Sequence, residues 1–221
     1  LLSKKLYDDV KKYVELKDVF FCANGIETQK HVFKQKNYKI TAPVKILFLS
    51  NLIESKGVYV LLDALSVLKQ NGVNFSCNFV GGEGDISKEL FNKKMKFLNL
   101  GDKVEYLGEK YGDEKYNILD NSDIFVFPTF YHNECFPLVL LEAMQFGLPI
   151  ITTNEGGILD IVEENKTGLI IKKKCHEDLA NKIHWLINNQ KVVKTMSLEA
   201  RSKFERKYCF LDFKKRFKWN E

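Results

Sequence analysis

Six short apolar segments recur along the chain, and most are bounded by Gly, Pro, Asn or Asp. They cover residues 45–50, 75–80, 103–107, 123–128, 149–153 and 168–172. Continuous apolar runs of this length are typical of parallel strands that are covered on both faces, whereas half-exposed strands alternate. The pattern therefore predicts about six buried strands.

Helical periodicity fills the intervals between these strands. Residues 58–69 carry one apolar stripe, and residues 89–98 and 113–121 repeat the pattern more weakly. The stripe consists of Val58, Leu61, Leu62, Leu65 and Leu68. Such alternation predicts an α/β fold with a doubly wound, Rossmann-like parallel sheet. Beyond Lys172 the pattern is helical, at 175–188, 192–207 and 211–219, which predicts a helical carboxyl-terminal tail.

The first 42 residues follow a different pattern. Residues 1–16 predict one basic amphipathic helix, 19–22 a short strand, and the polar stretch 27–42 a linker. We therefore expect residues 43–221 to form the main domain and 1–42 to lie outside it. The chain starts with Leu and lacks the features of a signal peptide, so we expect a processed product or a piece of a longer protein.

Composition and charge exclude several classes of protein. The 221 residues are 45% hydrophobic and 29% charged, which is ordinary for a globular domain with one full core. No apolar run approaches the roughly 18 residues of a membrane span. The net charge of +5 comes from short basic runs, which favours a solvated surface over a nucleic-acid footprint. A weak attraction to anionic lipid head groups remains an alternative.

The five cysteines are odd in number and widely spaced, without a Cys-x-x-Cys pair. This spacing predicts neither a zinc site nor a disulfide framework. Free cysteines fit a reducing compartment, so we expect a cytoplasmic protein, with peripheral contact at the inner membrane face as the alternative.

The densest chemical signal lies in residues 132–144, after a predicted strand, where open α/β sheets bind their ligands. Pro137 suits the first position of a helix because its missing N–H would have no helical acceptor there. The backbone N–H groups that follow it would point outward at the positive end of the helix dipole. This arrangement predicts an anion site that suits a phosphate.

Glu142 falls in the second turn of this helix, which is apolar nearly all round. Such a helix is buried, and an ionised carboxylate without partners there would cost several kcal/mol. A pair of ribose hydroxyls would satisfy the carboxylate. A neighbouring Lys or backbone N–H groups would satisfy it equally well.

Two further loops carry weaker signals. Lys56 stands in a strand-to-helix loop, from which a lysine can reach a phosphate, although most loop lysines are simply solvated. Residues 80–84 are rich in glycine and permit close backbone approach, but they are not a dinucleotide fingerprint.

The order of these motifs resembles a known family. The series runs through Lys56-Gly57, 79–84, Leu107-Gly108, 122–128, Glu134, 142–150, Gly156-Gly157 and 167–169. Seven residues separate Glu134 from Glu142. It is similar to the carboxyl-terminal, donor-binding half of the retaining GT-B glycosyltransferases called family 4 or group 1. The resemblance covers about residues 44–190.

The resemblance implies a retaining, metal-independent hexosyltransferase that takes a UDP- or GDP-linked sugar as donor and needs no cofactor. It implies that Lys56 neutralises the departing diphosphate, Glu134 contacts the sugar, Glu142 holds the ribose and residues 107–111 border the base. The implied catalytic residues are Lys56 and Glu134, and the implied donor-binding residues are Asn51, Gly82, Tyr111, Cys135, Phe136, Pro137, Leu138, Val139 and Glu142. No Asp-x-Asp is present to hold a cation.

The chain departs from the family in one residue and one domain. Asn51 stands where the family often has an Arg, so it offers an amide donor without charge. In the family the amino-terminal domain binds the acceptor, here expected to be a carbohydrate or lipid-linked hydroxyl. Residues 1–42 resemble only the end of that domain, so we expect this chain alone to bind donor but transfer little.

Two other functions fit the same residues. A GT-B-like nucleotide-sugar epimerase is one, although the Glu134–Glu142 pair with Phe136-Pro137 favours transfer. A non-catalytic nucleotide-binding module is the other, and the loss of a cation at Asn51 is its main support.

Overall fold

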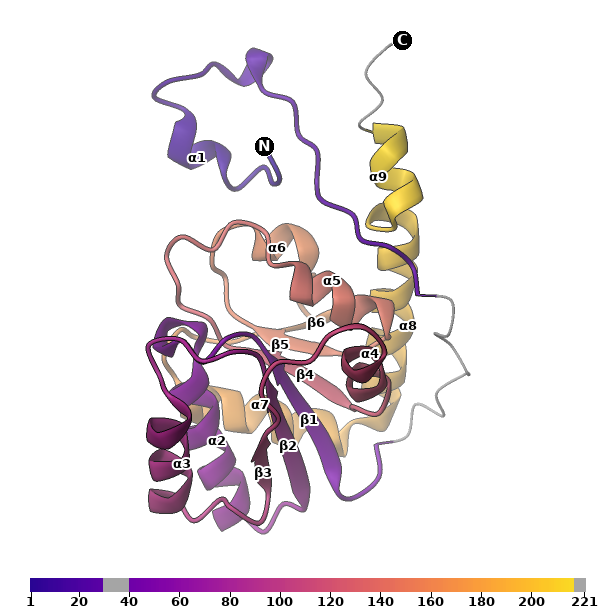
Figure 1. Ribbon diagram of the computed structural model, residues 1–221. Helices are drawn as coiled ribbons and strands as arrows, with labels where there is room; N and C mark the ends of the chain where they lie inside the picture. The colour runs from indigo at the N-terminus through magenta and orange to yellow at the C-terminus, as the bar shows by residue number, and fades with distance from the viewer. Residues whose placement is uncertain (30–39, 217–221) are drawn as a thin grey trace.

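The computed structural model describes residues 1–29 and 40–216, and a parallel sheet of six strands lies at its centre (Figure 1). The strands are β1 (Val44–Leu49), β2 (Phe75–Val80), β3 (Val104–Tyr106), β4 (Ile124–Phe127), β5 (Ile150–Thr152) and β6 (Gly168–Ile170). Their order in the sheet is β3-β2-β1-β4-β5-β6. The chain thus winds outward from β1 to one edge and from β4 to the other, as the doubly wound prediction requires.

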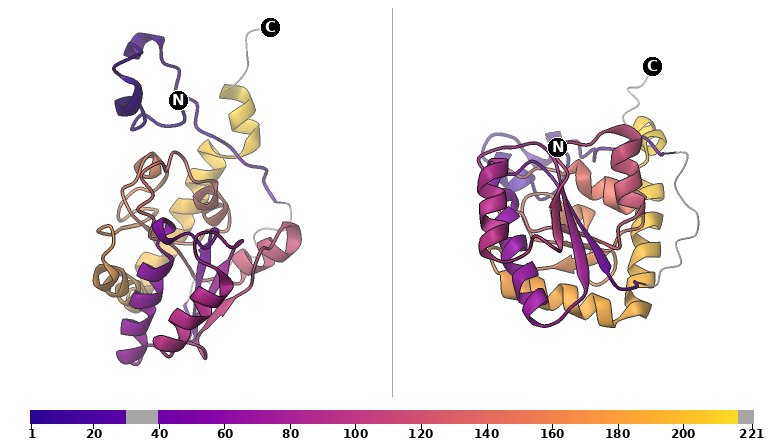
Figure 2. Two further views of the ribbon diagram at one scale, coloured as in Figure 1. Left: turned by 60° about the vertical axis from the view of Figure 1, so that its left-hand side comes forward. Right: turned by 60° about the horizontal axis from the view of Figure 1, so that its bottom comes forward.

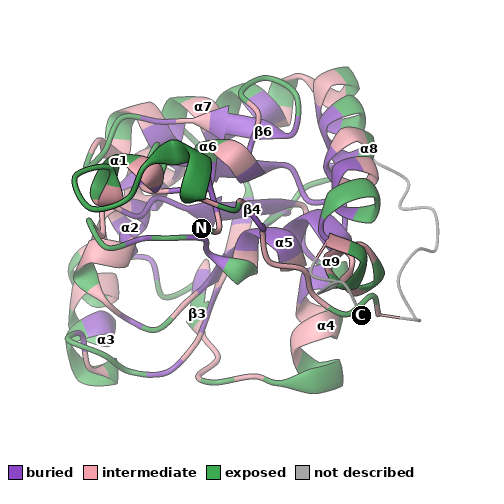
Figure 3. Ribbon diagram, turned by 90° about the horizontal axis from the view of Figure 1, so that it is seen from above, coloured by how far each residue is buried: buried purple, intermediate pink, exposed green. Residues whose placement is uncertain are grey.

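Helices cover both faces of this sheet (Figures 2 and 3). The longer helices are α2 (Val58–Gln70), α3 (Lys88–Phe97), α4 (Gly112–Asp120), α5 (Leu138–Gln145), α7 (His176–Asn188) and α8 (Gln190–Lys207). Helices α2 and α3 lie on one face with α7 packed along α2, while α4 and α5 lie on the other face with α8 along α5. The short helices α6 (Ile158–Ile161) and α9 (Phe210–Arg216) complete this part of the fold.

Burial on both faces explains the continuous apolar runs of the strands. Every residue of β4 is buried, and β1 exposes only Lys45. Aromatic rings link the sheet to α3, with Phe79 centred 5.1 Å from Phe48 and 4.9 Å from Phe91. Pairs of this kind contribute about 0.5–1.5 kcal/mol beyond their buried area. All six predicted strands and the helices between them are confirmed, with shifts of one or two residues at their ends.

Two predictions for the amino-terminal segment are wrong. Residues 1–16 contain the single-turn helix α1 (Tyr7–Val10) and the first residue of the 3-10 helix η1 (Leu16–Asp18), and 19–22 form no strand. A helix is stable in a protein when its apolar face packs, but the side chains of Tyr13 and Leu16 are 84% and 57% exposed. The segment is instead held by polar contacts, among them the long-range hydrogen bond from Ser3 Oγ to Asp160 at 2.5 Å.

The predicted linker at 27–42 lies mostly outside the described residues. On its near side, Ile26 donates to Tyr208 O and accepts from Phe210 N, at the junction of α8 and α9. On its far side, the Ile40 N–H donates to the Gln190 side chain at the start of α8. Both ends of the stretch are thereby fixed to the carboxyl-terminal helices. No helix in the described part of the chain is long and apolar enough to cross a membrane.

A charge cluster secures α8 to the loop after α6. Lys203 is buried, and its Nζ contacts Glu163 Oε1 at 2.7 Å and donates to Asp160 O at 2.9 Å. The pKa of Glu163 falls from its ordinary 4.5 to about 2, chiefly because Lys203 donates to the carboxylate, with Lys166 adding to the effect. Burial lowers the pKa of Lys203.

This cluster predicts a pH-dependent stability. A carboxyl group with a lowered folded pKa stabilises the fold above its unfolded pKa of 4.5, and the contribution disappears as the pH falls toward 2. We expect Glu163→Gln to lower the unfolding midpoint by several degrees at pH 7, because Lys203 loses its partner, and the difference from the wild type to shrink below pH 4.5.

Thermal unfolding followed by circular dichroism between pH 2.5 and 7.5 checks this expectation. Glu164→Gln is the matched control, because its carboxylate lies 3.8 Å from Lys182 and is more exposed. A Glu163→Gln difference that stayed constant across this pH range would contradict the assignment.

Candidate functional site

Three loops meet where strands β1, β2 and β3 end. The Gly82 N–H donates to Asn51 Oδ1 at 3.0 Å, which joins the loop after β1 to the glycine-rich turn after β2. The Gly81 N–H donates to Gly108 O at 3.0 Å, which joins that turn to the loop after β3. The motifs that are separate in sequence are thus brought to one edge of the sheet, where open α/β sheets bind ligands.

Gly57 brings Lys56 next to the end of β4. Its φ of +88° lies in the left-handed region, and a Cβ there would stand 2.4 Å from Pro128 O. The same loop accepts a hydrogen bond at Ser55 O from the Phe130 N–H at 2.7 Å. The loops after the neighbouring strands β1 and β4 therefore run in contact.

Lys56 and Glu134 form an ion pair at this junction. Lys56 Nζ lies 2.6 Å from Glu134 Oε2, and their side chains are only 16% and 8% exposed. Thr129 Oγ1 lies 3.4 Å from the same carboxylate oxygen, and the ammonium sits 4.5 Å from the centre of the Tyr131 ring. A charge pair this enclosed needs close mutual contact, because removing either partner leaves the other ion without compensation.

The loop after β5 supports the backbone that carries Glu134. Gly156 has φ +46°, and a Cβ there would overlap Glu134 O at 1.5 Å. The Gly157 N–H donates to Cys135 O at 2.9 Å. Glu134 is thus positioned by contacts from two other loops, while the Cys135 side chain is exposed.

Helix α5 points its amino terminus at this junction. It begins at Leu138, so the expectation that Pro137 is its first residue is off by one, and Pro137 is the cap with φ −68°. Phe136 is 5% exposed and packs edge-on against Tyr208. The first N–H groups of an α-helix have no acceptor within the helix, so those of Leu138 and Val139 stand at the positive end of the dipole.

Glu142 is only partly buried, which corrects the expectation of a fully enclosed carboxylate. Its side chain is 18% exposed. Lys115 on α4 places its Nζ 2.6 Å from Glu142 Oε1. Of the alternatives left open by the sequence, a neighbouring Lys is therefore the partner within this chain.

Sequence reasoning missed Lys115, Thr129 and Tyr131. Thr129 and Tyr131 follow β4 directly, so their position at the carboxyl end of a strand was the available signal. Lys115 gave no such signal, because nothing in the sequence pairs α4 with α5. Tyr111 lies at the margin of the site with its side chain 70% exposed.

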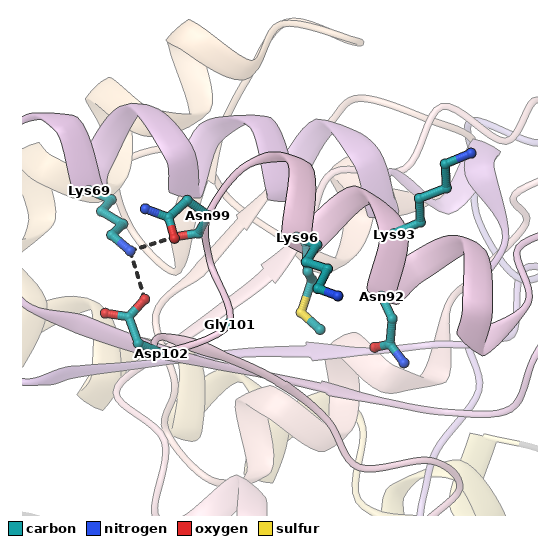
Figure 4. A pocket seen from close by; sticks show the side chains of 8 residues that line it. Lys69, Asn92, Lys93, Lys96, Asn99, Gly101 and Asp102 are labelled. Atoms are coloured by element: carbon teal, nitrogen blue, oxygen red, sulfur yellow. Dashed lines mark hydrogen bonds and ion pairs between the residues drawn. The ribbon is translucent and has the colours of Figure 1, made fainter.

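A hollow of about 890 Å³ lies elsewhere in the molecule (Figure 4). The second half of α3, the end of α2 and the turn before β3 line it, including Lys69 and Asp102, which form an ion pair at 2.7 Å. This is the edge where β2 and β3 begin, opposite to the edge that carries Lys56 and Glu134. Among the described residues no group of three or more His, Cys, Asp or Glu side chains is arranged to hold a metal ion.

Comparisons with known proteins agree with this architecture. Residues 29–203 match the model of the family described as glycosyl transferases group 1. The chain is 31% identical over 188 residues to the amylovoran biosynthesis glycosyltransferase AmsK of Erwinia amylovora, covering 83% of this chain and 46% of that protein. It is 26% identical over 195 residues to the capsular polysaccharide biosynthesis glycosyltransferase CapM of Staphylococcus aureus, covering 86% and 50%.

Solved structures share the fold. The crystal structure of Anabaena Alr3699/HepE in complex with UDP and glucose superposes with a TM-score of 0.80 at 18% identity, covering 94% of this chain and 57% of that one. The chain spans about half the length of the curated relatives that it matches. By its match over residues 29–203, the chain belongs to the group 1 glycosyl transferases, and its sheet is one Rossmann-like half of a GT-B fold.

Proposed function

We propose that this chain binds a nucleotide-diphosphate sugar and, together with an acceptor-binding domain, transfers a hexose to an acceptor hydroxyl with retained anomeric configuration. The observation that carries the proposal is the Lys56–Glu134 ion pair, which lies beside the amino terminus of α5 at the carboxyl edge of the sheet. This arrangement combines an anion site with a carboxylate that can accept hydrogen bonds from sugar hydroxyls.

The diphosphate belongs at the amino terminus of α5. The backbone N–H groups of Phe136, Leu138 and Val139 would donate to its oxygens, with the helix dipole behind them. Lys56 would stabilise the negative charge that develops when the bond to the sugar breaks. A fixed cation of this kind typically contributes a few kcal/mol to the transition state.

The two glutamates divide the remaining parts of the donor between them. Glu134 is buried next to Lys56 and would accept hydrogen bonds from the sugar close to the reacting carbon. Glu142 lies in the second turn of α5 and would accept hydrogen bonds from the ribose hydroxyls. The loop 107–111, tied to the glycine-rich turn through Gly108, would border the base, with Tyr111 at its margin.

The similar proteins support this assignment. The Anabaena protein was crystallised with UDP and glucose, and the Erwinia and Staphylococcus relatives are named for amylovoran and capsular polysaccharide biosynthesis. We therefore place the reaction in the synthesis of a cell-surface polysaccharide or glycoconjugate, with a carbohydrate or lipid-linked acceptor. In this proposal Lys56 and the helix terminus supply the positive charge that faces the diphosphate.

Donor binding can be measured on this chain directly. We expect calorimetry to show that UDP or GDP binds with a Kd below about 1 mM. Glu142→Ala should weaken that binding roughly tenfold, because hydrogen bonds to a charged carboxylate are lost. Glu105→Ala, which removes an exposed carboxylate on β3, is the control and should bind as the wild type does. The absence of any heat of binding at millimolar nucleotide would reject the donor site.

Transfer can be measured on the protein that carries an acceptor-binding domain. We expect Lys56→Ala and Glu134→Ala each to lower turnover by more than roughly tenfold, because each removes a group placed at the reacting centre. Lys69→Ala, which breaks an ion pair at the opposite edge of the sheet, is the control.

Each variant also breaks a buried ion pair, so unfolding midpoints must accompany the rates. Glu134→Gln retains the shape of the side chain and should show the same loss of turnover with a smaller loss of stability. Wild-type rates in folded Lys56→Ala and Glu134→Ala would refute both roles.

A further inference from the structure

The Lys115–Glu142 ion pair joins α4 to α5 within the candidate site. Lys115 Nζ lies 2.6 Å from Glu142 Oε1, and the two side chains are 20% and 18% exposed. Glu142 Oε2 makes no hydrogen bond to the described part of the chain. Lys115 therefore holds the carboxylate through Oε1, and Oε2 remains available to accept hydrogen bonds.

Several contacts fix the helix that carries Lys115. The ring of Tyr116, the next residue, stacks on Phe146 at 6.0 Å with 21° between the ring planes. The Tyr116 hydroxyl accepts a hydrogen bond from Gln29 Nε2 at 3.0 Å, and the Gln29 N–H donates to Gln145 Oε1 at 2.9 Å. Gln29 thus ties α4 to α5 one turn beyond Glu142, so the position of Lys115 does not depend on the ion pair alone.

We propose that Lys115 is a positioning residue for donor binding, which holds Glu142 so that its second oxygen meets the ribose hydroxyls. The inference rests on the proposed role of Glu142. A glutamate has three rotatable side-chain bonds, and binding a diol with an unrestrained carboxylate costs the entropy of ordering them. Lys115 imposes that order before the ligand arrives, and preorganisation of this kind raises affinity.

The ion pair does not block the hydroxyls. Each carboxylate oxygen has two lone pairs, so Oε1 can accept from a hydroxyl while it holds Lys115, and Oε2 is open. The opposite role, in which Lys115 competes with the ribose and must leave, predicts tighter binding when the lysine is removed. The two roles therefore differ in the sign of the effect.

The test compares a nucleoside diphosphate with its 2′,3′-dideoxy analogue. The Kd of UDP, or of GDP if the wild type binds that base, is measured by calorimetry for the wild type and for Lys115→Met. We expect Lys115→Met to weaken binding of the ribose nucleotide roughly fivefold to fiftyfold, the range typical of two residues that contact each other, as Lys115 and Glu142 do. Binding of the dideoxy analogue should change by less than about twofold, because it lacks the hydroxyls through which Lys115 acts.

Two further variants separate this role from general effects. Lys115→Arg keeps a donor at the carboxylate and should recover a large part of the lost affinity for the ribose nucleotide. Lys94→Met removes a lysine from a comparable half-buried pair, at 2.7 Å from Asp63 on the opposite face, and should bind both nucleotides as the wild type does.

Each other outcome overturns the inference. Equal weakening of both nucleotides would show that Lys115 acts through the fold or through its charge alone. Tighter binding would show that it competes with the ribose, and an unchanged Kd would show that Glu142 needs no such support. A wild type that binds neither nucleotide would overturn the proposed function itself, which distinguishes that failure from the loss of this inference.

Discussion

The candidate site depends on a close approach of backbones at the carboxyl edge of the sheet. Side chains cannot fit where Gly57 meets Pro128 O or where Gly156 meets Glu134 O. Because β1 and β4 are neighbours in the sheet although three helices and two strands separate them in the chain, these contacts put Lys56 beside Glu134. The strand order and the two glycines together create the ion pair.

The sequence predicted the sheet well because burial on both faces leaves an unmistakable mark, a continuous apolar run between turn residues. It failed for residues 1–16, where the basic amphipathic pattern suggested a helix but the apolar side chains of Tyr13, Val14 and Leu16 remain exposed. The strand pattern placed Lys56 and Glu134 in loops that follow strands, but it did not single out Thr129 or Tyr131, which also follow β4. Lys115 was not predictable, because its role depends on how α4 and α5 pack, and periodicity carries no information on pairs of helices.

Pairing with lysine stabilises ionised glutamates that are largely shielded from water at the carboxyl edge of the sheet. Glu134, Glu142 and Glu155 each have a lysine nitrogen at 2.6 Å, and each lysine comes from a different loop or helix. An isolated ion there would cost several kcal/mol, whereas a paired carboxylate keeps acceptor lone pairs for further hydrogen bonds. In the proposed complex, sugar hydroxyls would therefore replace water around Glu134 and Glu142 and leave their lysine partners in place.

Asn51 shows how the small number of positive charges near the diphosphate constrains the proposed reaction. Its amide oxygen accepts the Gly82 N–H, a hydrogen bond that an arginine cannot make because its guanidinium has no acceptor. The position thus ties two loops together where the family resemblance implies a second cation. The charge of Lys56 is already shared with Glu134, and the amino terminus of α5 adds a positive potential equivalent to about half an elementary charge. In the proposed reaction, stabilisation of the leaving diphosphate therefore rests on Lys56 and that helix terminus more than in a site with arginine at this position.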